Sequence, residues 1–228
     1  MSPIPPAPTP LQRTYVWSAP LRLSHWLLAV SLIGLWLSGW LMQHAPSLHL
    51  ASREYHLFLA WLLIPALALR LVLLLTGKGS AAGWRDLWPK HWRGVRDTLR
   101  FYVTLGQWPL PRWYAHNPLW APLYLLLFLA LLVQIGSGIL LWQDRFPQGR
   151  DPMALHDPLA ALLGAFMILH VLAVLIHDWR SGNSDVSAML HGYRIFRLEK
   201  PVIPPDIRGE QVISLDSLRR PGKRDDRT

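Results

Sequence analysis

Two histidines in one apolar segment are the residues best placed to do chemistry. His156 and His170 lie fourteen residues apart in the stretch 154–178, ALHDPLAALLGAFMILHVLAVLIHD. In an α-helix, fourteen residues turn about 1400°, roughly 40° short of four full turns, and rise about 21 Å. The two imidazoles therefore face nearly the same way at two depths, so one helix can offer one ligand to each of two stacked metal centres.

Four apolar segments can position these side chains. Each window is about 20 or more predominantly apolar residues long, enough to cross a hydrocarbon core of about 30 Å. Three of them contain no Asp, Glu, Lys or Arg, and the second contains only Arg70. The windows are Leu23–Met42, Tyr55–Thr76, Leu119–Trp142 and Pro158–His177. The sequence therefore predicts an all-α fold, a multi-pass integral membrane four-helix bundle.

The charged residues predict how the bundle lies in the membrane. The net charge is +9, and 19 of the 23 Lys and Arg residues precede the first span, separate the second from the third, or follow the fourth. The two other loops hold only three. This positive-inside bias places both termini in the cytoplasm. We expect the spans to lie in the inner membrane of a bacterial cell. The basic charge thus reflects topology and contact with anionic lipid, and we expect no nucleic-acid partner.

The predicted domains follow from the same pattern. Residues 1–20 form a Pro-rich cytoplasmic tail, residues 21–197 the membrane domain, and residues 198–228 a flexible charged cytoplasmic tail. Within the membrane domain, the spans cover about 23–42, 55–76, 119–142 and 157–178. The N-terminus does not resemble a signal peptide, so we expect the first span to be retained.

The chain contains no cysteine. Disulfides, thiolate zinc sites, Cys-ligated iron–sulfur clusters and covalently attached c-type haem are therefore excluded. A redox centre in this chain must use histidine, methionine or carboxylate ligands.

Histidines inside the spans fall into two pairs by depth. With alternating topology, His25 and His170 lie near the cytoplasmic side, and His56 and His156 near the outer side. Two imidazoles on facing helices can hold a b-type haem, whereas zinc needs more ligands at each depth. His177 lies one heptad after His170 and by depth alone could replace it opposite His25. Any one histidine could instead be a hydrogen-bonded structural residue.

Other polar or small residues are candidates for a supporting role. Arg70 shares the face of His56 at the inner depth, where it either pairs with a haem propionate or snorkels. Gly39, on the outer-depth face of the first span, leaves room for a planar group or for helix packing. The glycines Gly136 and Gly138 of the third span likewise permit close approach of a neighbour or cofactor.

A quinone would need a polar partner at the edge of the membrane. His116 and Asn117, at the inner mouth of the third span, are candidates for such a site. Their alternative role is a helix start, with Asn117 as the cap and Pro118 in the first turn. His191 and Tyr193 also lie on the inner side and are not ranked by the sequence.

Several motifs together resemble one known family. The chain is similar, from about Val16 to Arg197, to the b-type cytochrome subunit of nickel–iron hydrogenases, a di-haem cytochrome b561-like family related to the gamma subunit of formate dehydrogenases. The similar motifs are RLSHW at 22–26, HNPL at 116–119, LLVQIGSGILL at 131–141, His156-x13-His170 and SAMLHGYRIF at 187–196.

The resemblance implies a fold, cofactors and partners. It implies four core helices and two haems b, with axial ligands His25, His56, His156 and His170, and it favours His170 over His177. The pairs are His56 with His156 and His25 with His170. It further implies an electron-transfer subunit of a quinone-reducing complex, rather than an enzyme on its own. Electrons would come from a periplasmic iron–sulfur dehydrogenase, most naturally a Ni/Fe hydrogenase, and pass to membrane quinone.

Two other functions remain compatible with the sequence. The chain could be a stand-alone b561-type cytochrome that serves other electron donors, or a haem-free structural membrane anchor. The sequence alone does not separate hydrogenase from formate dehydrogenase as the donor, because nothing in the short outer loops is diagnostic.

Overall fold

The structure is a computed structural model that describes residues 11–77, 81–89, 91–181 and 185–197. The chain divides into a compact unit of residues 13–196 and a second unit made of residues 1–12 and 197–228. The helices and histidines discussed below belong to the compact unit. Of the two predicted tails, residues 1–10 and 198–228 lie outside the described residues, and Leu11–Tyr15 forms strand β1.

Four long helices dominate the compact unit, as the hydropathy pattern predicts. Each is long and apolar enough to cross a membrane by length and composition. The predicted spans lie within these helices, except that the third helix begins one residue after Leu119. They are α1 (Ala19–His44), α2 (His49–Thr76), α5 (Trp120–Trp142) and α6 (Met153–Ser181). The prediction of an all-α architecture with four long apolar helices is confirmed.

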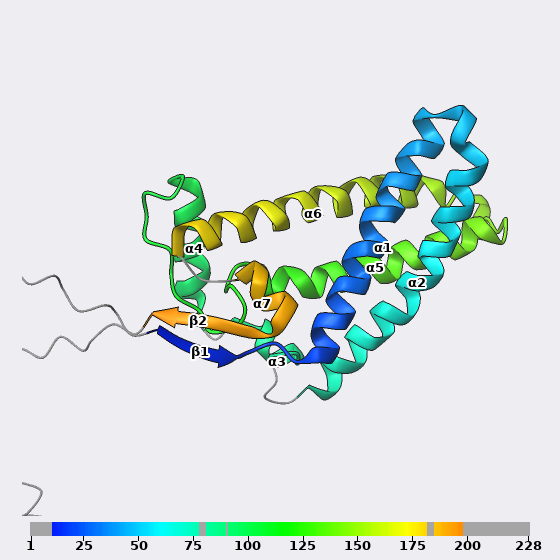
Figure 1. Ribbon diagram of the computed structural model, residues 1–228. Coiled ribbons are helices and arrows are strands. Elements are labelled where there is room, and N and C mark those ends of the chain that lie inside the picture. The colour runs from blue at the N-terminus through cyan, green and yellow to red at the C-terminus, as the bar shows by residue number, and fades with distance from the viewer. Residues whose placement is uncertain (1–10, 78–80, 90, 182–184, 198–228) are drawn as a thin grey trace, which may run out of the picture. The chain divides into compact units, whose positions relative to one another are not determined.

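The long helices pack in two pairs, which Figure 1 shows as α1 beside α2 and α5 beside α6. Helix α1 also contacts α6, and α2 contacts α5, so each pair touches the other. Ser24, Ser31 and Ser38 recur every seven residues on α1 and are all buried. Small side chains at this spacing allow neighbouring helices to approach closely. This packing brings histidines of α1 and α2 to α6.

Side chains are distributed for an apolar surrounding. Many large apolar residues point outward; Leu75, for example, is 75% exposed. The buried residues include polar ones, such as Arg70, Ser137 and His177, as well as apolar ones, such as Leu67 and Leu131. A water-soluble protein exposes polar groups and buries apolar ones. The arrangement seen here instead suits a lipid environment, in which polar groups face the inside of the bundle.

Short elements connect or follow the long helices. Helix α4 covers Trp92–Val103 in the loop between α2 and α5. Phe101 on α4 is buried while Leu99 and Val103 are exposed. The other short elements are η1 (Pro46–Leu48), α3 (Trp84–Leu87), η2 (Pro147–Gly149), α7 (Asp185–His191) and β2 (Tyr193–Arg197).

Strands β1 and β2 form a two-stranded sheet. At its end, the carbonyl of Gly192 accepts hydrogen bonds from the amides of Val16 and Trp17. Gly192 has φ +88°, and a Cβ there would lie 2.7 Å from the carbonyl oxygen of Trp17. Both the backbone angle and the close approach favour glycine at this position.

Candidate functional site

Two histidine pairs lie inside the bundle, and α6 contributes one member to each. The rings of His25 (α1) and His170 (α6) have centroids 6.4 Å apart and planes inclined at 56°. The rings of His56 (α2) and His156 (α6) also have centroids 6.4 Å apart, with planes inclined at 59°. These are the two pairs that the depth argument predicts.

The spacing within each pair fits two axial ligands of one iron ion. An imidazole nitrogen binds a first-row metal at about 2 Å, so two imidazoles on opposite sides of one ion have centroids about 6 Å apart. Each pair supplies two nitrogens, which is the number of axial positions on a haem. A closed zinc site takes four ligands. Within the described parts of the chain, no group of three or more His, Cys, Asp or Glu side chains could hold a metal ion.

Serine and glycine residues of the neighbouring helices contact the His56–His156 pair. The hydroxyl of Ser38 lies 2.9 Å from Nδ1 of His56, and that of Ser137 lies 2.9 Å from Nδ1 of His156. The residue after each serine is a glycine whose missing Cβ would face the same ring. The glycines were candidates in the sequence, but the serines were not. The signal that could have revealed them is the Ser-Gly doublet present in both helices.

The His25–His170 pair has different surroundings. Nδ1 of His25 is buried and has no hydrogen-bond partner among the described residues. Nδ1 of His170 lies 3.4 Å from the hydroxyl of Tyr124, which is a long contact. The ring of His170 stacks on Phe166 at 6.2 Å and meets Trp120 edge-on at 5.9 Å. Aromatic side chains therefore enclose this pair more than hydrogen bonds orient it.

Arg70 is a buried cation near these residues, with only 5% of its surface exposed. Its guanidinium donates to the carbonyl of Ala82 at 3.0 Å and lies over the ring of Phe128 at 5.0 Å. Within the described residues, no carboxylate lies within ion-pair distance of it. A buried guanidinium without an anionic partner is suited to accept one, and a haem propionate has the required charge.

Asn117 caps the helix that follows it. Its Oδ1 accepts hydrogen bonds from the amides of Leu119 at 2.9 Å and Trp120 at 3.4 Å. Its Nδ2 is buried and has no partner. The helix-start role is therefore present, and it occupies only the oxygen of the side chain. The amide nitrogen remains free to donate.

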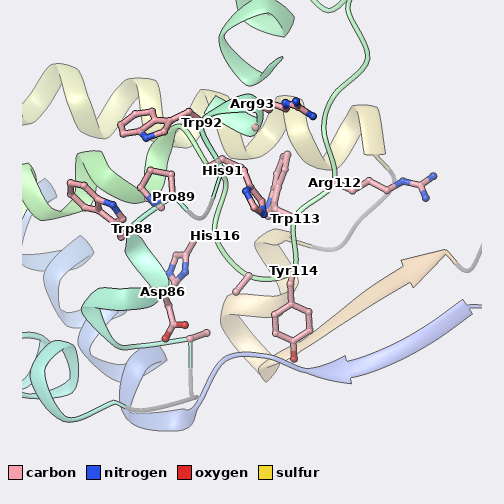
Figure 2. Close-up of a pocket in the computed structure, with 15 residues that line it drawn as sticks. Asp86, Trp88, Pro89, His91, Trp92, Arg93, Arg112, Trp113, Tyr114 and His116 are labelled. Atoms are coloured by element: carbon pink, nitrogen blue, oxygen red, sulfur yellow. The ribbon is translucent and has the colours of Figure 1, made fainter. Parts of the chain in front are cut away.

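His116 lines a cavity of about 1090 Å³. Figure 2 shows its ring together with side chains from α3, from the segment that leads into α4, from the start of α4 and from the segment before α5, including Trp88, Trp92 and Trp113. Nδ1 of His116 is buried without a partner. Burial is the largest cause that lowers the pKa of His116 to about 3, and the positive charges of Arg70 and Arg194 lower it further. The imidazole is therefore neutral at physiological pH.

Comparison with known proteins identifies the family. The family model described as "Prokaryotic cytochrome b561" matches residues 16–192. The chain belongs to this family. A b-type cytochrome carries haem b, and the paired histidines provide the ligand type that such a haem requires. The four apolar helices are accordingly those of a multi-pass membrane protein.

Several curated relatives of this cytochrome b561 family are similar along most of the chain. Each is named a probable Ni/Fe-hydrogenase B-type cytochrome subunit. The relative from Cupriavidus necator is 25% identical over 221 residues, covering 82% of this chain and 89% of its own length. The hydrogenase 1 subunit of Escherichia coli K12 is 24% identical over 222 residues, with 82% and 92% covered. The Azotobacter vinelandii relative is 26% identical, with 82% and 90% covered. No solved structure matches the chain.

His177 lies away from the two histidine pairs of this b561-family chain. It is 3% exposed, and its Nε2 lies 2.7 Å from the hydroxyl of Tyr102. That hydroxyl also accepts a hydrogen bond from Nε1 of Trp120 at 2.8 Å, and burial raises the pKa of Tyr102. The ring of His177 packs edge-on against Trp113 at 5.0 Å. The geometry therefore brings His170, and not His177, opposite His25.

One residue of the SAMLHGYRIF segment has a structural role that the sequence analysis did not single out. Arg194 is 1% exposed and forms an ion pair with Asp185 at 2.5 Å. It also donates to the carbonyls of Trp113 at 2.9 Å and Tyr114 at 2.6 Å. It thus fastens the segment before α5 to the segment after α6. His191 and Tyr193, which the sequence did not rank as site residues, are both exposed. The backbone amide of Tyr193 donates a hydrogen bond to Nδ1 of His191.

Proposed function

We propose that this chain is the membrane electron-transfer subunit of a Ni/Fe hydrogenase complex, carrying electrons through two haems b to quinone. The strongest support for this proposal is that α6 contributes one histidine to each of the two histidine pairs. The haem in each pair supplies a reversible one-electron change at iron. In this proposal His25 and His170 hold one haem and His56 and His156 hold the other. Arg70 pairs with a propionate.

Other side chains of the bundle separate the two centres and shape their surroundings. Fourteen residues of α6 separate its two ligands by about 21 Å along the helix, so the two centres occupy different depths. Phe166, Trp120 and Tyr124 exclude water from the His170 side. Exclusion of solvent and hydrogen bonding to the ligands are the means by which a protein sets a haem potential.

The positive-inside charge bias supports an orientation in the inner membrane. Both termini lie in the cytoplasm in this proposal, so the His56–His156 pair lies toward the periplasm. Electrons enter there from the iron–sulfur subunit of the hydrogenase. The names of the relatives support that partner, since each is a probable subunit of a Ni/Fe hydrogenase.

Quinone reduction is placed at the opposite end, beside His116 and Asn117. Conversion of a quinone to a quinol takes two electrons and two protons, and protons are available from the cytoplasm. Nδ2 of Asn117 has a free hydrogen to donate to a quinone carbonyl, and neutral His116 has an unpartnered Nδ1. The neighbouring cavity of about 1090 Å³ is large enough for a headgroup.

Haem content and visible spectra of the purified chain test the haem assignment. We expect two haems b per chain in the wild type and one after alanine replacement of His25, His56, His156 or His170. His177→Ala is the matched control, because it removes a buried imidazole from the same helix and should leave both haems. A colourless wild type would overturn the proposal and leave a structural membrane anchor.

Reconstitution tests the electron donor. In liposomes that contain a menaquinone or ubiquinone analogue, hydrogen should reduce the haems only when the hydrogenase subunits are present. Full reduction by a small diffusible donor, with no gain from hydrogen and hydrogenase, would instead indicate a stand-alone cytochrome.

Asn117 offers a test of the quinone site that separates its two roles. Asn117→Ser keeps an oxygen that can cap α5 but lacks the amide donor. We expect slower quinone reduction with unchanged haem spectra and stability. Asn117→Leu should lose both quinone reduction and stability. Wild-type turnover in Asn117→Ser would remove this residue from the site.

A further inference from the structure

The two rings of the His56–His156 pair rest on the same two-residue element. Ser38 and Gly39 of α1 face His56 of α2, and Ser137 and Gly138 of α5 face His156 of α6. A Cβ on Gly39 would lie 3.7 Å from Cε1 of His56, and one on Gly138 would lie 3.3 Å from Cε1 of His156. Each ring is therefore seated on a Ser-Gly doublet of the neighbouring helix.

The hydrogen bonds of the serines determine which ring nitrogen carries the proton. A serine hydroxyl has one hydrogen to donate and lone pairs to accept. Ser38 donates to the carbonyl of Gly34 at 2.7 Å, and Ser137 donates to the carbonyl of Gln134 at 3.0 Å. Since each hydroxyl hydrogen is used within its own helix, the oxygen accepts from the histidine.

The histidine tautomer follows from that direction of bonding. With the serine hydrogens used in this way, Nδ1 of His56 and Nδ1 of His156 would each carry a hydrogen and donate it to the serine oxygen 2.9 Å away. In a neutral imidazole the other nitrogen then has a free lone pair. Nε2 of each ring is therefore the nitrogen that would bind the metal.

The other histidine pair has no such seat. Nδ1 of His25 is buried without a partner, and Nδ1 of His170 has only the long contact with Tyr124. A hydrogen bond donated by Nδ1 makes an imidazole a more basic ligand. A more basic ligand stabilises the ferric state of haem iron and lowers its reduction potential. The two pairs thus differ in a property that controls electron flow.

We propose that Ser38 and Ser137 are positioning residues that hold His56 and His156 in the Nδ1-protonated form and lower the potential of the haem bound there below that of the haem at His25 and His170. The proposal rests on the proposed function, since it requires haem at both pairs. With this order of potentials, an electron that enters at the His56–His156 pair moves downhill to the other pair. The hydroxyl groups of Ser38 and Ser137 thereby favour one direction of electron transfer.

A redox titration of the purified protein, read by visible spectra and by electron paramagnetic resonance, tests the assignment. In Ser38→Ala and Ser137→Ala, the lower of the two midpoint potentials should rise, and it should rise further in the double variant. The higher potential should not move. Haem affinity at the affected pair should fall by roughly 10- to 100-fold, the usual cost of removing a partner of a metal-binding histidine.

Ser31→Ala is the matched control. Ser31 lies on α1 one heptad before Ser38, is fully buried, and its hydroxyl contacts no hydrogen-bond partner. Its removal should leave both potentials unchanged. If the alanine variants do not accumulate in the membrane, Ser38→Thr and Ser38→Val provide a pair of equal size that differs in the hydroxyl. Thr should retain the wild-type potential and Val should not.

The outcomes separate this inference from the function on which it rests. Two haems whose potentials are the same in wild type, Ser38→Ala and Ser137→Ala would overturn the serine assignment while leaving the proposed function intact. A shift of both potentials together, or an equal shift in Ser31→Ala, would overturn it as well. Absence of haem in the wild type would overturn both proposals.

Discussion

The hydroxyl of Tyr102 in α4 lies 2.7 Å from Nε2 of His177 in α6, at hydrogen-bond distance. The same hydroxyl accepts a hydrogen bond of 2.8 Å from Nε1 of Trp120 in α5. The side chain of Tyr102 on the short helix α4 therefore bridges two long helices through His177 and Trp120.

Replacement of Tyr102 by Phe should loosen α4 without changing the haems. It removes the hydrogen bonds that the Tyr102 hydroxyl makes with His177 and Trp120, and each buried group left unsatisfied costs about 1–3 kcal/mol. Hydrogen exchange should report faster opening of Trp92–Val103, while the visible spectra stay as in the wild type. Tyr55→Phe is the control, since Tyr55 is 68% exposed. Loss of a haem in Tyr102→Phe would show that His177 has a different role.

Gly136 and Gly138 lie two residues apart on α5, so alanine at each position gives a matched comparison. A Cβ on Gly138 would meet the ring of His156 at 3.3 Å, whereas a Cβ on Gly136 would meet nothing within 4 Å. Gly138→Ala should therefore displace His156 and weaken one haem, visible as a reduced and shifted absorption band. Gly136→Ala should keep the wild-type spectrum. Equal spectra for the two variants would contradict the seating of His156 on Gly138.

Arg194→Ala should destabilise the protein strongly. It leaves Asp185 and the carbonyls of Trp113 and Tyr114 without their buried cation, and breaking a buried pair costs roughly 3–5 kcal/mol. Thermal unfolding in detergent and proteolysis of the segment before α5 would measure the effect. Arg96→Ala breaks a solvent-exposed pair with Asp97 and should cost less than about 1 kcal/mol. Similar effects of the two replacements would argue against the buried clamp.

His116 should make the fold sensitive to mild acid. Its pKa is lowered from 6.5 to about 3 in the folded chain, mainly by burial, so its contribution to stability is complete above about pH 6.5. That contribution falls progressively as the pH drops toward 3, because the unfolded chain takes up a proton that the folded chain refuses. Unfolding midpoints at pH 7 and pH 5 should differ less in His116→Phe than in the wild type. An equal difference would rule out this cause.

The sequence predicts the helices well because their signal is local. Twenty apolar residues in succession have few alternatives to a membrane helix, and α1, α2, α5 and α6 cover the predicted windows. The pairing of His25 with His170 and of His56 with His156 also follows from simple counting, since alternating topology fixes depth. Whether these residues bind iron remains a prediction, as does the role of Arg70.

Other features could not be predicted because they depend on contacts between distant segments. A serine in an apolar helix is normally a small packing residue, and only the position of His56 beside Ser38 gives it a further role. Arg194 lies in a basic segment after α6, and its burial depends on Asp185 and on the carbonyls of the segment before α5. His177 was ambiguous by depth, and its contacts with Tyr102 and Trp113, which lie far from it in the sequence, could not be foreseen.

The presence of His156 and His170 on one uninterrupted helix also limits how such a chain can diverge. A single residue inserted between them would rotate one imidazole by about 100° relative to the other and move it about 1.5 Å along the axis. The loops elsewhere can lengthen or shorten without this effect. An insertion or deletion among the thirteen residues between the two histidines would therefore separate one of the two sites from its partner histidine.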